Sequence, residues 1–341
     1  MTTWYIESGP EADVVISSRV RLARNFENYP FPSRMNSGQE LKVLEITKDA
    51  VLNCEGGKKF TFFALKTMPQ IDKQALVEKH VISRELAESK RESGVIISND
   101  EKVSIMINEE DHLRIQSLYP GMQIDNAYKL CDKIDDILES KIDYAFSQNY
   151  GYLTCCPTNL GTGIRASVMM HLPALTMTGY IRNVLEACGK LGITVRGLYG
   201  ENSEASGNMF QISNQVTMGL TEDEIIANVT NIASQIVEQE RNLRNRLYKS
   251  DPIRIEDKVY RSLGLFTSAR IISSEESLRL LSDIRLGKDL GIINNISTEI
   301  LNEIMLLIQP ANLQKAAGRI LNPDERDVKR AEIIRRKLGY S

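Results

Sequence analysis

The chain has 341 residues, which is long enough to bury a large hydrophobic core and to divide into two domains. Its 42 Lys and Arg residues against 45 Asp and Glu residues give a net charge of −3, so the overall charge predicts no direct nucleic-acid partner. No segment approaches the roughly 20 apolar residues of a membrane span, and no early apolar run resembles a signal peptide. We therefore expect a cytoplasmic protein without a membrane partner.

The cysteines follow neither the pattern of a disulfide framework nor that of a zinc site. There are five of them, an odd number, without a C-x-x-C pair or a neighbouring histidine. Zinc sites need such clusters of thiolate and imidazole ligands, so we expect no protein-bound metal. The cysteines are Cys54, Cys131, Cys155, Cys156 and Cys188.

Residues 13–22 alternate in the manner of a β-strand, in which successive side chains point to opposite faces. Ser17, Arg19 and Arg21 then share one face. Two arginines on one face need either an anion or open water, and the pattern alone fits both. The other face would carry Ile16, Ser18, Val20 and Leu22.

The next part of the chain predicts amphipathic helices at residues 38–54 and 72–91, with a strand at residues 59–65 between them. His80 lies in the second helix, where a lone histidine is usually structural or exposed. Residues 102–108 predict a buried strand.

Three acids follow that strand, within the sequence Asn-Glu-Glu-Asp-His at residues 108–112. They are consistent with the first turn of a helix, where the helix dipole favours negative charge, and equally with a carboxylate site. Residues 122–146 then predict one long helix packed on a sheet.

The densest group of reactive residues lies at residues 152–171. Cys156 ends an apolar run that predicts a strand, and a turn follows in which Gly161 and Gly163 allow positive φ. Arg165 opens the next extended segment, and fixed positive charge near a thiol favours the thiolate. The pattern fits a reaction centre, although a buried structural cysteine is the commoner case.

A helix at residues 177–191 is expected to end at Gly192 in the left-handed conformation. Residues 193–214 predict strand, polar loop and strand, and the loop carries Glu201 and Glu204 between glycines. Such a loop is either a substrate lid or an ordinary hairpin connection.

The end of the chain predicts only helices, and we place the boundary between a catalytic domain, residues 1–248, and a helical domain, residues 249–341. Thr221 opens a capping box before a helix that continues to about residue 249. Further helices are expected at residues 275–286, 298–308 and 324–338. In the last of them, Arg326, Asp327 and Arg330 fit either exposed salt bridges or a binding pocket.

Several of these blocks together resemble one family. Cys-Pro-Thr-Asn-Leu-Gly-Thr at residues 156–162 resembles the signature of the phosphagen (ATP:guanidino) kinases, and Asn-Glu-Glu-Asp-His resembles a second one. Arg-Asp-x-x-Arg-Ala at residues 326–331 is similar to a pattern of the bacterial protein-arginine kinases. The resemblance implies an α+β fold, with a largely antiparallel sheet flanked by helices and a small all-helical C-terminal domain.

The resemblance also implies a set of site residues. The catalytic residues would be Glu110, Glu204 and Cys156. The ATP-binding residues would be Ser17, Ser18, Arg19, Val20, Arg21, His80, Arg114, Arg165, Ala166, Ser167, Val168, Met169, Arg196, Gly197, Leu198, Tyr199, Gly200 and Glu201. A regulatory phosphoarginine pocket would consist of Arg326, Asp327, Arg330 and Ala331.

The activity implied is ATP-dependent phosphorylation of arginine side chains in proteins, with Mg²⁺. A guanidinium stays protonated up to a pKa of about 12, so two carboxylates would orient it while Cys156 assists electrostatically as a thiolate. Neither a phosphate-binding Gly-x-x-x-x-Gly-Lys loop nor the protein-kinase motifs occur. The implied partners are proteins with exposed arginines, a zinc-binding activator, a heat-shock repressor, a Clp ATPase and protease, and a second copy of the chain.

Some features depart from the small-molecule members of the family. Met169 and Tyr199 stand where those enzymes usually have histidine and arginine. The chain also starts near the nucleotide strand, without the helical domain that covers a small substrate in them. Two alternatives nonetheless stay open: a kinase of small guanidino molecules, and an inactive phosphoarginine-binding adaptor.

Overall fold

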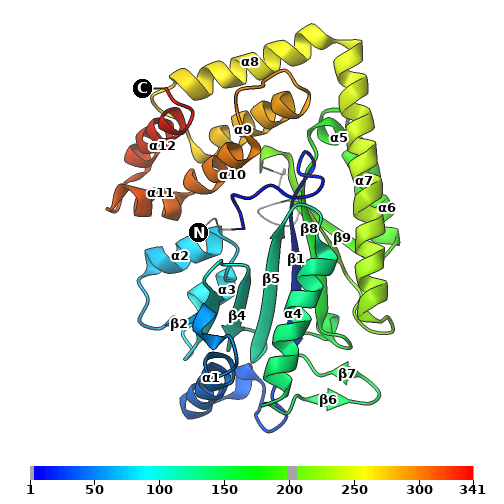
Figure 1. Ribbon diagram of the computed structural model, residues 1–341, viewed down its shortest axis with the longest axis vertical. Helices are drawn as coiled ribbons and strands as arrows, with labels where there is room; N and C mark the ends of the chain where they lie inside the picture. Colours follow the sequence, from blue (N-terminus) through cyan, green and yellow to red (C-terminus); the bar gives the residue numbers. More distant parts are fainter. Residues whose placement is uncertain (1–3, 198–205, 341) are drawn as a thin grey trace.

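The computed structural model describes residues 4–197 and 206–340, and a single antiparallel sheet of eight strands lies at its centre (Figure 1). The strand order is β2-β3-β4-β5-β1-β8-β10-β9, and every neighbouring pair is antiparallel, which confirms the predicted largely antiparallel sheet. The strands are β1 (Val15–Arg24), β2 (Phe60–Ala64), β3 (Gly94–Ser98), β4 (Val103–Ile107), β5 (Leu113–Pro120), β8 (Ile164–His171), β9 (Ile193–Gly197) and β10 (Met209–Asn214). A separate hairpin pairs β6 (Phe146–Ser147) with β7 (Gly151–Tyr152).

One face of the sheet is covered by helices and forms the main core. Val20 and Leu22 of β1 and Val168 of β8 point to this face and are fully buried. They pack with apolar residues of three helices, α1 (Ser37–Leu52), α4 (Ile124–Glu139) and the long α7 (Glu222–Ser250). Because side chains alternate along a strand, Arg19 and Arg21 point to the opposite face.

Shorter helices lie at the edges of the sheet. They are α2 (Gln70–Glu78), α3 (Arg84–Glu88), α5 (Pro173–Met177) and α6 (Ile181–Lys190). Gly192, just after α6, has a φ of 69°, which confirms the predicted left-handed residue. The capping box at Thr221 is also confirmed, because its side chain accepts from Glu224 N while the Glu224 carboxylate accepts from Thr221 N.

The last five helices pack around a second hydrophobic core that includes Phe266, Leu281 and Ile304. They form the upper part of the view in Figure 1. Their bounds are α8 (Pro252–Ser268), α9 (Ser274–Asp289), α10 (Thr298–Leu307), α11 (Pro310–Ala317) and α12 (Pro323–Lys337). The predicted all-helical C-terminal part is confirmed, although α8 and α11 were not among the helices that the sequence predicted.

Other expectations were wrong in detail. The helix expected at residues 72–91 is two helices, α2 and α3, separated by a turn in which His80 has a φ of 60°. Val81 and Ile82 after this turn are buried in a small core under β3, and that burial interrupts the helix. The helix expected at residues 122–146 ends at Glu139. The strand that was expected to end at Cys156 is only the short β7, which ends at Tyr152.

None of the helices in residues 4–197 and 206–340 combines the length and apolar character needed to cross a bilayer.

Candidate active site

The open face of the sheet carries a cleft walled by arginines. Its cavity has a volume of about 410 Å³. Its lining comes from five strands, β1, β5, β8, β9 and β10, together with the start of α3, the acidic segment after β4 and the turn after Cys156. Five of the expected ATP-binding residues line it, namely Arg19, Arg21, Arg114, Arg165 and Arg196. Strand register brings them together, since Arg21 lies opposite Arg165 and Ala23 lies opposite Arg114.

Positive charge in this cleft is poorly compensated. Desolvation and the charges of Arg114 and Arg165 lower the pKa of Arg19 to about 10. Desolvation and the neighbouring arginines likewise place the pKa of Arg21 well below its ordinary value, and the Arg21 Nε is buried with no hydrogen-bond partner among the described residues. A bound polyanion such as a nucleoside triphosphate would compensate this positive charge and raise the pKa values of Arg19 and Arg21.

The acidic residues after β4 form one end of the cleft. Arg114 Nη1 donates to Glu109 Oε1 over 2.7 Å, and Arg114 Nη2 donates to Glu110 Oε2 over 3.2 Å. The Glu110 side chain is 44% exposed and faces the cleft, whereas that of Glu109 is 3% exposed. Desolvation raises the pKa of Glu110, with Asp111, Glu109 and Glu85 acting in the same direction and Arg114 opposing them. A carboxylate of this kind can accept hydrogen bonds from a guanidinium that enters the cleft.

The other members of the Asn-Glu-Glu-Asp-His block support the site from behind. Asp111 Oδ1 accepts from Asn25 Nδ2 and from Cys155 N, both over 2.7 Å. His112 is fully buried, and its Nδ1 accepts from Phe26 N over 2.9 Å. These contacts hold β1, the acidic segment and the cysteine segment together, so Glu110 and Cys156 face the same cleft.

Cys156 lines the cleft and directly precedes a short 3-10 turn, Pro157–Asn159. Its Sγ lies 3.0 Å from Thr158 Oγ1, and either atom could be the donor. Gly163, at the end of the turn, has a φ of 67°, and a Cβ there would lie 2.7 Å from Ala23 O. The predicted positive φ at Gly163 is thus confirmed, as it is at Gly161, where φ is 106°.

The two adjacent cysteines have different surroundings. Burial and the neighbouring Asp111 raise the pKa of Cys155, which does not line the cleft. Cys156 instead lines the cavity beside Arg165. A substrate in the cleft would therefore meet the thiol of Cys156 and not that of Cys155.

Other expected ATP-binding residues lie beside the arginines. Ser17, His80 and Met169 line a second cavity of about 730 Å³ that shares Arg19 and Ser83 with the first. Although the His80 side chain is accessible from this cavity, desolvation and the charges of Arg19 and Arg84 lower its pKa to about 4. His80 is therefore neutral at pH 7.

Five expected residues do not present side chains to either cavity. The Ser18 hydroxyl donates to Gly121 O and accepts from Gln123 N on the covered face. Val20, Ala166 and Val168 are buried in the main core, and Ser167 Oγ donates to Arg19 O. Their strands, β1 and β8, are paired on both sides, which leaves few free amides for phosphate contacts. Gly197 ends β9, and Leu198, Tyr199, Gly200, Glu201 and Glu204 lie outside the described residues.

The expected phosphoarginine residues lie on α12, and their exposure differs. The Arg330 side chain is 2% exposed and donates to Ile308 O, Ile272 O and Asp327 Oδ1. Ala331 is part of the second core. The Asp327 side chain is 31% exposed and the Arg326 side chain is partly exposed, so these two are the members that a ligand can reach.

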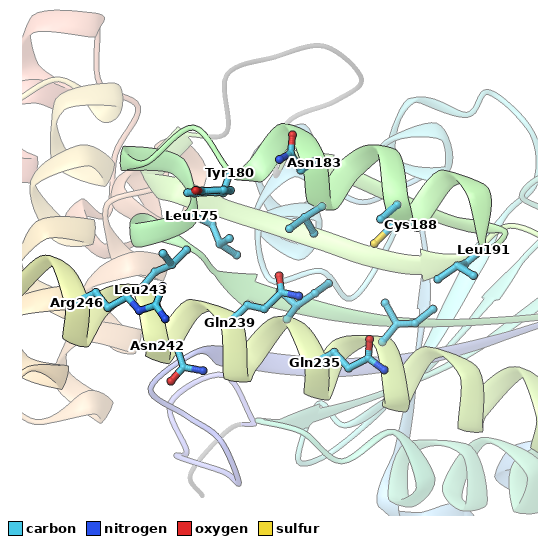
Figure 2. Close-up of a pocket in the computed structure, with 14 residues that line it drawn as sticks. Leu175, Tyr180, Asn183, Cys188, Leu191, Gln235, Gln239, Asn242, Leu243 and Arg246 are labelled. Atoms are coloured by element: carbon cyan, nitrogen blue, oxygen red, sulfur yellow. The ribbon is translucent and has the colours of Figure 1, made fainter.

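A third cavity, of about 590 Å³, lies between α6 and α7, away from all of these residues (Figure 2). Its lining is largely apolar and amide, and Arg246 is the one charged side chain among the described residues there. The described part of the chain also contains no group of three His, Cys, Asp or Glu side chains placed to hold a metal.

Ser83 and Thr158 are among the residues of the first cleft to which the sequence reasoning gave no role. The Ser83 hydroxyl caps α3 by accepting from Leu86 N and donates to Glu109 Oε1. Thr158 contacts Cys156. A serine three residues before Leu86 is a recognisable N-cap signal, but its link to Glu109 depends on the turn at His80, which the sequence did not predict.

Comparison with known proteins agrees with this geometry. Residues 42–243 match the family model described as ATP:guanido phosphotransferase, C-terminal catalytic domain, and residues 252–341 match the model described as Protein-arginine kinase McsB C-terminal domain. The chain belongs to the ATP:guanido phosphotransferases and, among them, to the family of bacterial protein-arginine kinases.

Similar sequences extend over almost the full chain. A protein named protein-arginine kinase from Halothermothrix orenii is 50% identical over 339 residues, which cover 99% of this chain and 97% of that protein. The protein of the same name from Bacillus subtilis is 48% identical over 340 residues, covering 99% of this chain and 93% of its own.

Solved structures share the fold of the catalytic part. The duplicated taurocyamine kinase from Schistosoma mansoni, with bound transition state analog components, has a TM-score of 0.63 and 28% identity over 71% of this chain. The match covers about a third of that duplicated protein, 36% of its length. Lombricine kinase has a TM-score of 0.61 over 69% of this chain at 24% identity, which shows the fold alone.

Proposed function

We propose that this protein transfers the γ-phosphoryl group of Mg-ATP to arginine side chains of other proteins. The observation that carries the proposal is one cavity that brings together five arginines, the exposed carboxylate of Glu110 and the thiol of Cys156. The arginines can bind a triphosphate, while Glu110 and Cys156 can bind a guanidinium. Relatives named protein-arginine kinase support a protein-bound arginine as the acceptor.

In the proposed reaction, a guanidinium nitrogen attacks the γ-phosphorus, an N–P bond forms, and the bond from phosphorus to the leaving oxygen breaks to release ADP. Glu110 would orient the planar guanidinium through charge-assisted hydrogen bonds and, with Glu204, take up its proton. Cys156 would stabilise the positive guanidinium from the side. Arg19, Arg21 and Arg165 would neutralise charge on the transferred group. Mg²⁺ would enter as part of the Mg-ATP substrate.

Finer assignments rest on the family resemblance and on the match of residues 252–341 to the McsB C-terminal domain. We propose that residues 249–341 form a regulatory and dimerising domain, in which Arg326 and Asp327 contact phosphoarginine while the buried Arg330 and Ala331 hold them in place. We further propose a cytoplasmic enzyme of the stress response, with a zinc-binding activator, a heat-shock repressor and a Clp ATPase and protease as partners.

The test is to incubate the purified protein with Mg-ATP and either an unfolded basic protein or free arginine. Phosphorus NMR and mass spectrometry should then find acid-labile phosphate on nitrogen in the protein substrate only. Label on free arginine would point to a small-molecule guanidino kinase instead. Absence of label with both acceptors, even after a candidate activator is added, would favour a binding adaptor.

A further inference from the structure

A groove adjoins the arginine cleft at the turn that follows Cys156. It has a volume of about 370 Å³, and its walls are the β6–β7 hairpin, the end of the turn and the segment that leads into α7, at the lower right of Figure 1. We call it the hairpin groove. Asn159 lines the cleft and Gly161 lines this groove, and the Cα atoms of residues so close in the chain are at most about 7 Å apart. A polypeptide that inserts an arginine into the cleft can therefore reach the groove with its neighbouring residues.

Close backbone contacts fix the groove in its place beside the cleft. Gly151 of the hairpin has a φ of 70°, and a Cβ there would lie 2.5 Å from Gly161 O of the turn. The Thr217 hydroxyl lies 2.6 Å from Leu160 O and 3.0 Å from Thr158 O, and it can donate to either. Hairpin, turn and the segment before α7 are thus held together, so the groove keeps a fixed distance from the cleft that Thr158 lines.

Large apolar and aromatic side chains are exposed around the groove. The hairpin contributes Phe146 and Tyr150, and the segment before α7 contributes Met218 and Leu220. All four line the same groove. Single exposed apolar residues are ordinary on a protein surface, whereas a group of them around one hollow is typical of an interaction site.

The groove also carries negative charge. Glu222, in the first turn of α7, lines it directly. Burial raises the pKa of Tyr152 in the same wall against the opposing charge of Arg24. Glu139 and Glu222 add to the rise, so both acids lie near the Tyr152 ring. Neither acid forms an ion pair within the described parts of the chain. The groove therefore combines aromatic rings with carboxylates that have no basic partner.

Such a surface is complementary to a polypeptide with both apolar and basic side chains, because rings and carboxylates both attract cations. Folded proteins bury most of their apolar side chains, so a segment of this kind is exposed mainly in an unfolded chain. We propose that the hairpin groove binds the protein substrate, through an apolar and a basic residue located a few positions from the target arginine. This inference rests on the proposed function and adds a docking surface to it.

Two unstructured peptides with one central arginine test the docking role. In the first, phenylalanine and lysine flank the arginine on both sides, and in the second, serine replaces these flanking residues. The unaltered protein should show a KM about tenfold lower for the first peptide, with a similar kcat. Binding energy gained away from the reacting group, equally in ground state and transition state, lowers KM alone.

A matched pair of double variants tests the groove itself. Tyr150 and Met218 are 54% and 47% exposed in the groove, while Tyr180 and Met177 are 55% and 42% exposed and do not line it. Tyr150→Ala with Met218→Ala should raise the KM for the first peptide about tenfold, as expected for the loss of central contacts of an interface. Its kcat and both constants for the serine peptide should not change. Tyr180→Ala with Met177→Ala should behave like the unaltered protein.

Two neighbouring acids test the charge of the groove. Glu222 and Asp223 both lie in the first turn of α7, and only Glu222 lines the groove. Glu222→Gln should raise the KM for the lysine-containing peptide about twofold to fivefold at low salt, and less at high salt. Asp223→Asn should leave this KM unchanged.

The outcomes separate this inference from the proposed function. If the unaltered protein labels neither peptide nor an unfolded basic protein, even with a candidate activator, both fail. If it labels both peptides with the same KM, or if the two double variants behave alike, the docking surface is wrong and the kinase proposal stands. A groove variant that changes kcat equally for both peptides would also overturn the docking role. A changed sedimentation coefficient of that variant would instead assign the surface to contact between two copies of the chain.

Discussion

Arg21 on β1 and Arg165 on β8 lie directly opposite each other in the sheet, with both side chains in the same cleft. Like charges at such a cross-strand pair destabilise the sheet. The free protein therefore carries electrostatic strain that a bound polyanion would remove. The pair is therefore consistent with a phosphate-binding site that lowers the stability of the sheet.

Arg21→Gln should accordingly stabilise the free protein and impair nucleotide binding. Relief of the repulsion is worth about 0.2–1 kcal/mol, so the Tm without nucleotide should rise by about 1–3 °C. Mg-ATP should raise the Tm of the unaltered protein but not that of the variant. Differential scanning calorimetry with and without Mg-ATP measures both effects.

Arg24 on the same strand is the matched control. It forms a buried ion pair with Asp135, in which Nη2 and Oδ2 lie 2.6 Å apart, and its Nη1 donates to Thr162 O in the turn after Cys156. Arg24→Gln should destabilise the protein by about 3–5 kcal/mol, since it leaves a buried carboxylate unpaired. If Arg21→Gln lowered the Tm as well, Arg21 would be a structural residue.

The two adjacent cysteines give a second prediction. Cys156→Ser should lower kcat about a hundredfold, the order expected when one electrostatic contributor to a transition state is lost. Cys155→Ser should leave kcat near that of the unaltered protein, because Cys155 does not line the cleft, and burial and Asp111 keep it a thiol through a raised pKa. Steady-state kinetics on an unfolded basic protein provides the comparison, and equal losses in both variants would remove the assigned role of Cys156.

Much of the fold could be predicted from local patterns. Alternation along β1 correctly placed Arg19 and Arg21 opposite Val20, and capping at Thr221 correctly placed the start of α7. The break in the helix expected at residues 72–91 could not be predicted this way. It has no glycine or proline, and it depends on burial of Val81 and Ile82 against β3, which is a contact between distant segments.

The site was predictable to a different degree. The motif matches predicted that the arginines and Glu110 belong to one site. In the structure they line one cleft. A motif does not reveal which members of a block face the substrate. Asp111 and His112 stand beside Glu110 in sequence yet are fully buried supports, and Arg330 is bound to backbone carbonyls of two other segments. Such roles depend on packing across the chain.

The raised pKa of Glu110 predicts where activity is lost in acid. The ionised carboxylate is the form that accepts from a guanidinium, and protonation removes it as the pH falls through the pKa. The acid limb of kcat/KM should therefore lie above the ordinary glutamate pKa of about 4.3. A pH profile of kcat/KM for the protein substrate measures its position.

Two neighbours should move this limb in opposite directions. Glu85→Gln removes a like charge that raises the pKa of Glu110, so the limb should shift to lower pH. Arg114→Met removes the positive charge that lowers it, so the limb should shift to higher pH, with an overall loss of rate as well. A limb that stays in place in both variants would assign it to another group.

The last prediction concerns Glu240 of α7, whose buried carboxylate contacts α5 and also pairs with Arg244, the residue that reaches the helical part. Its two oxygens accept from Ala174 N and Leu175 N at the start of α5, each over 2.9 Å. It also pairs with Arg244 at 2.7 Å, and Arg244 reaches Asp289 of α9 at 3.3 Å. Glu240→Ala should lower the free energy of unfolding by about 3–5 kcal/mol, because it leaves a buried guanidinium and two amides without this partner.

Urea titration gives the value, and Glu238→Ala on the exposed side of the same helix should change it by less than about 0.5 kcal/mol. Similar stabilities for both variants would show that Asp289 alone can hold Arg244.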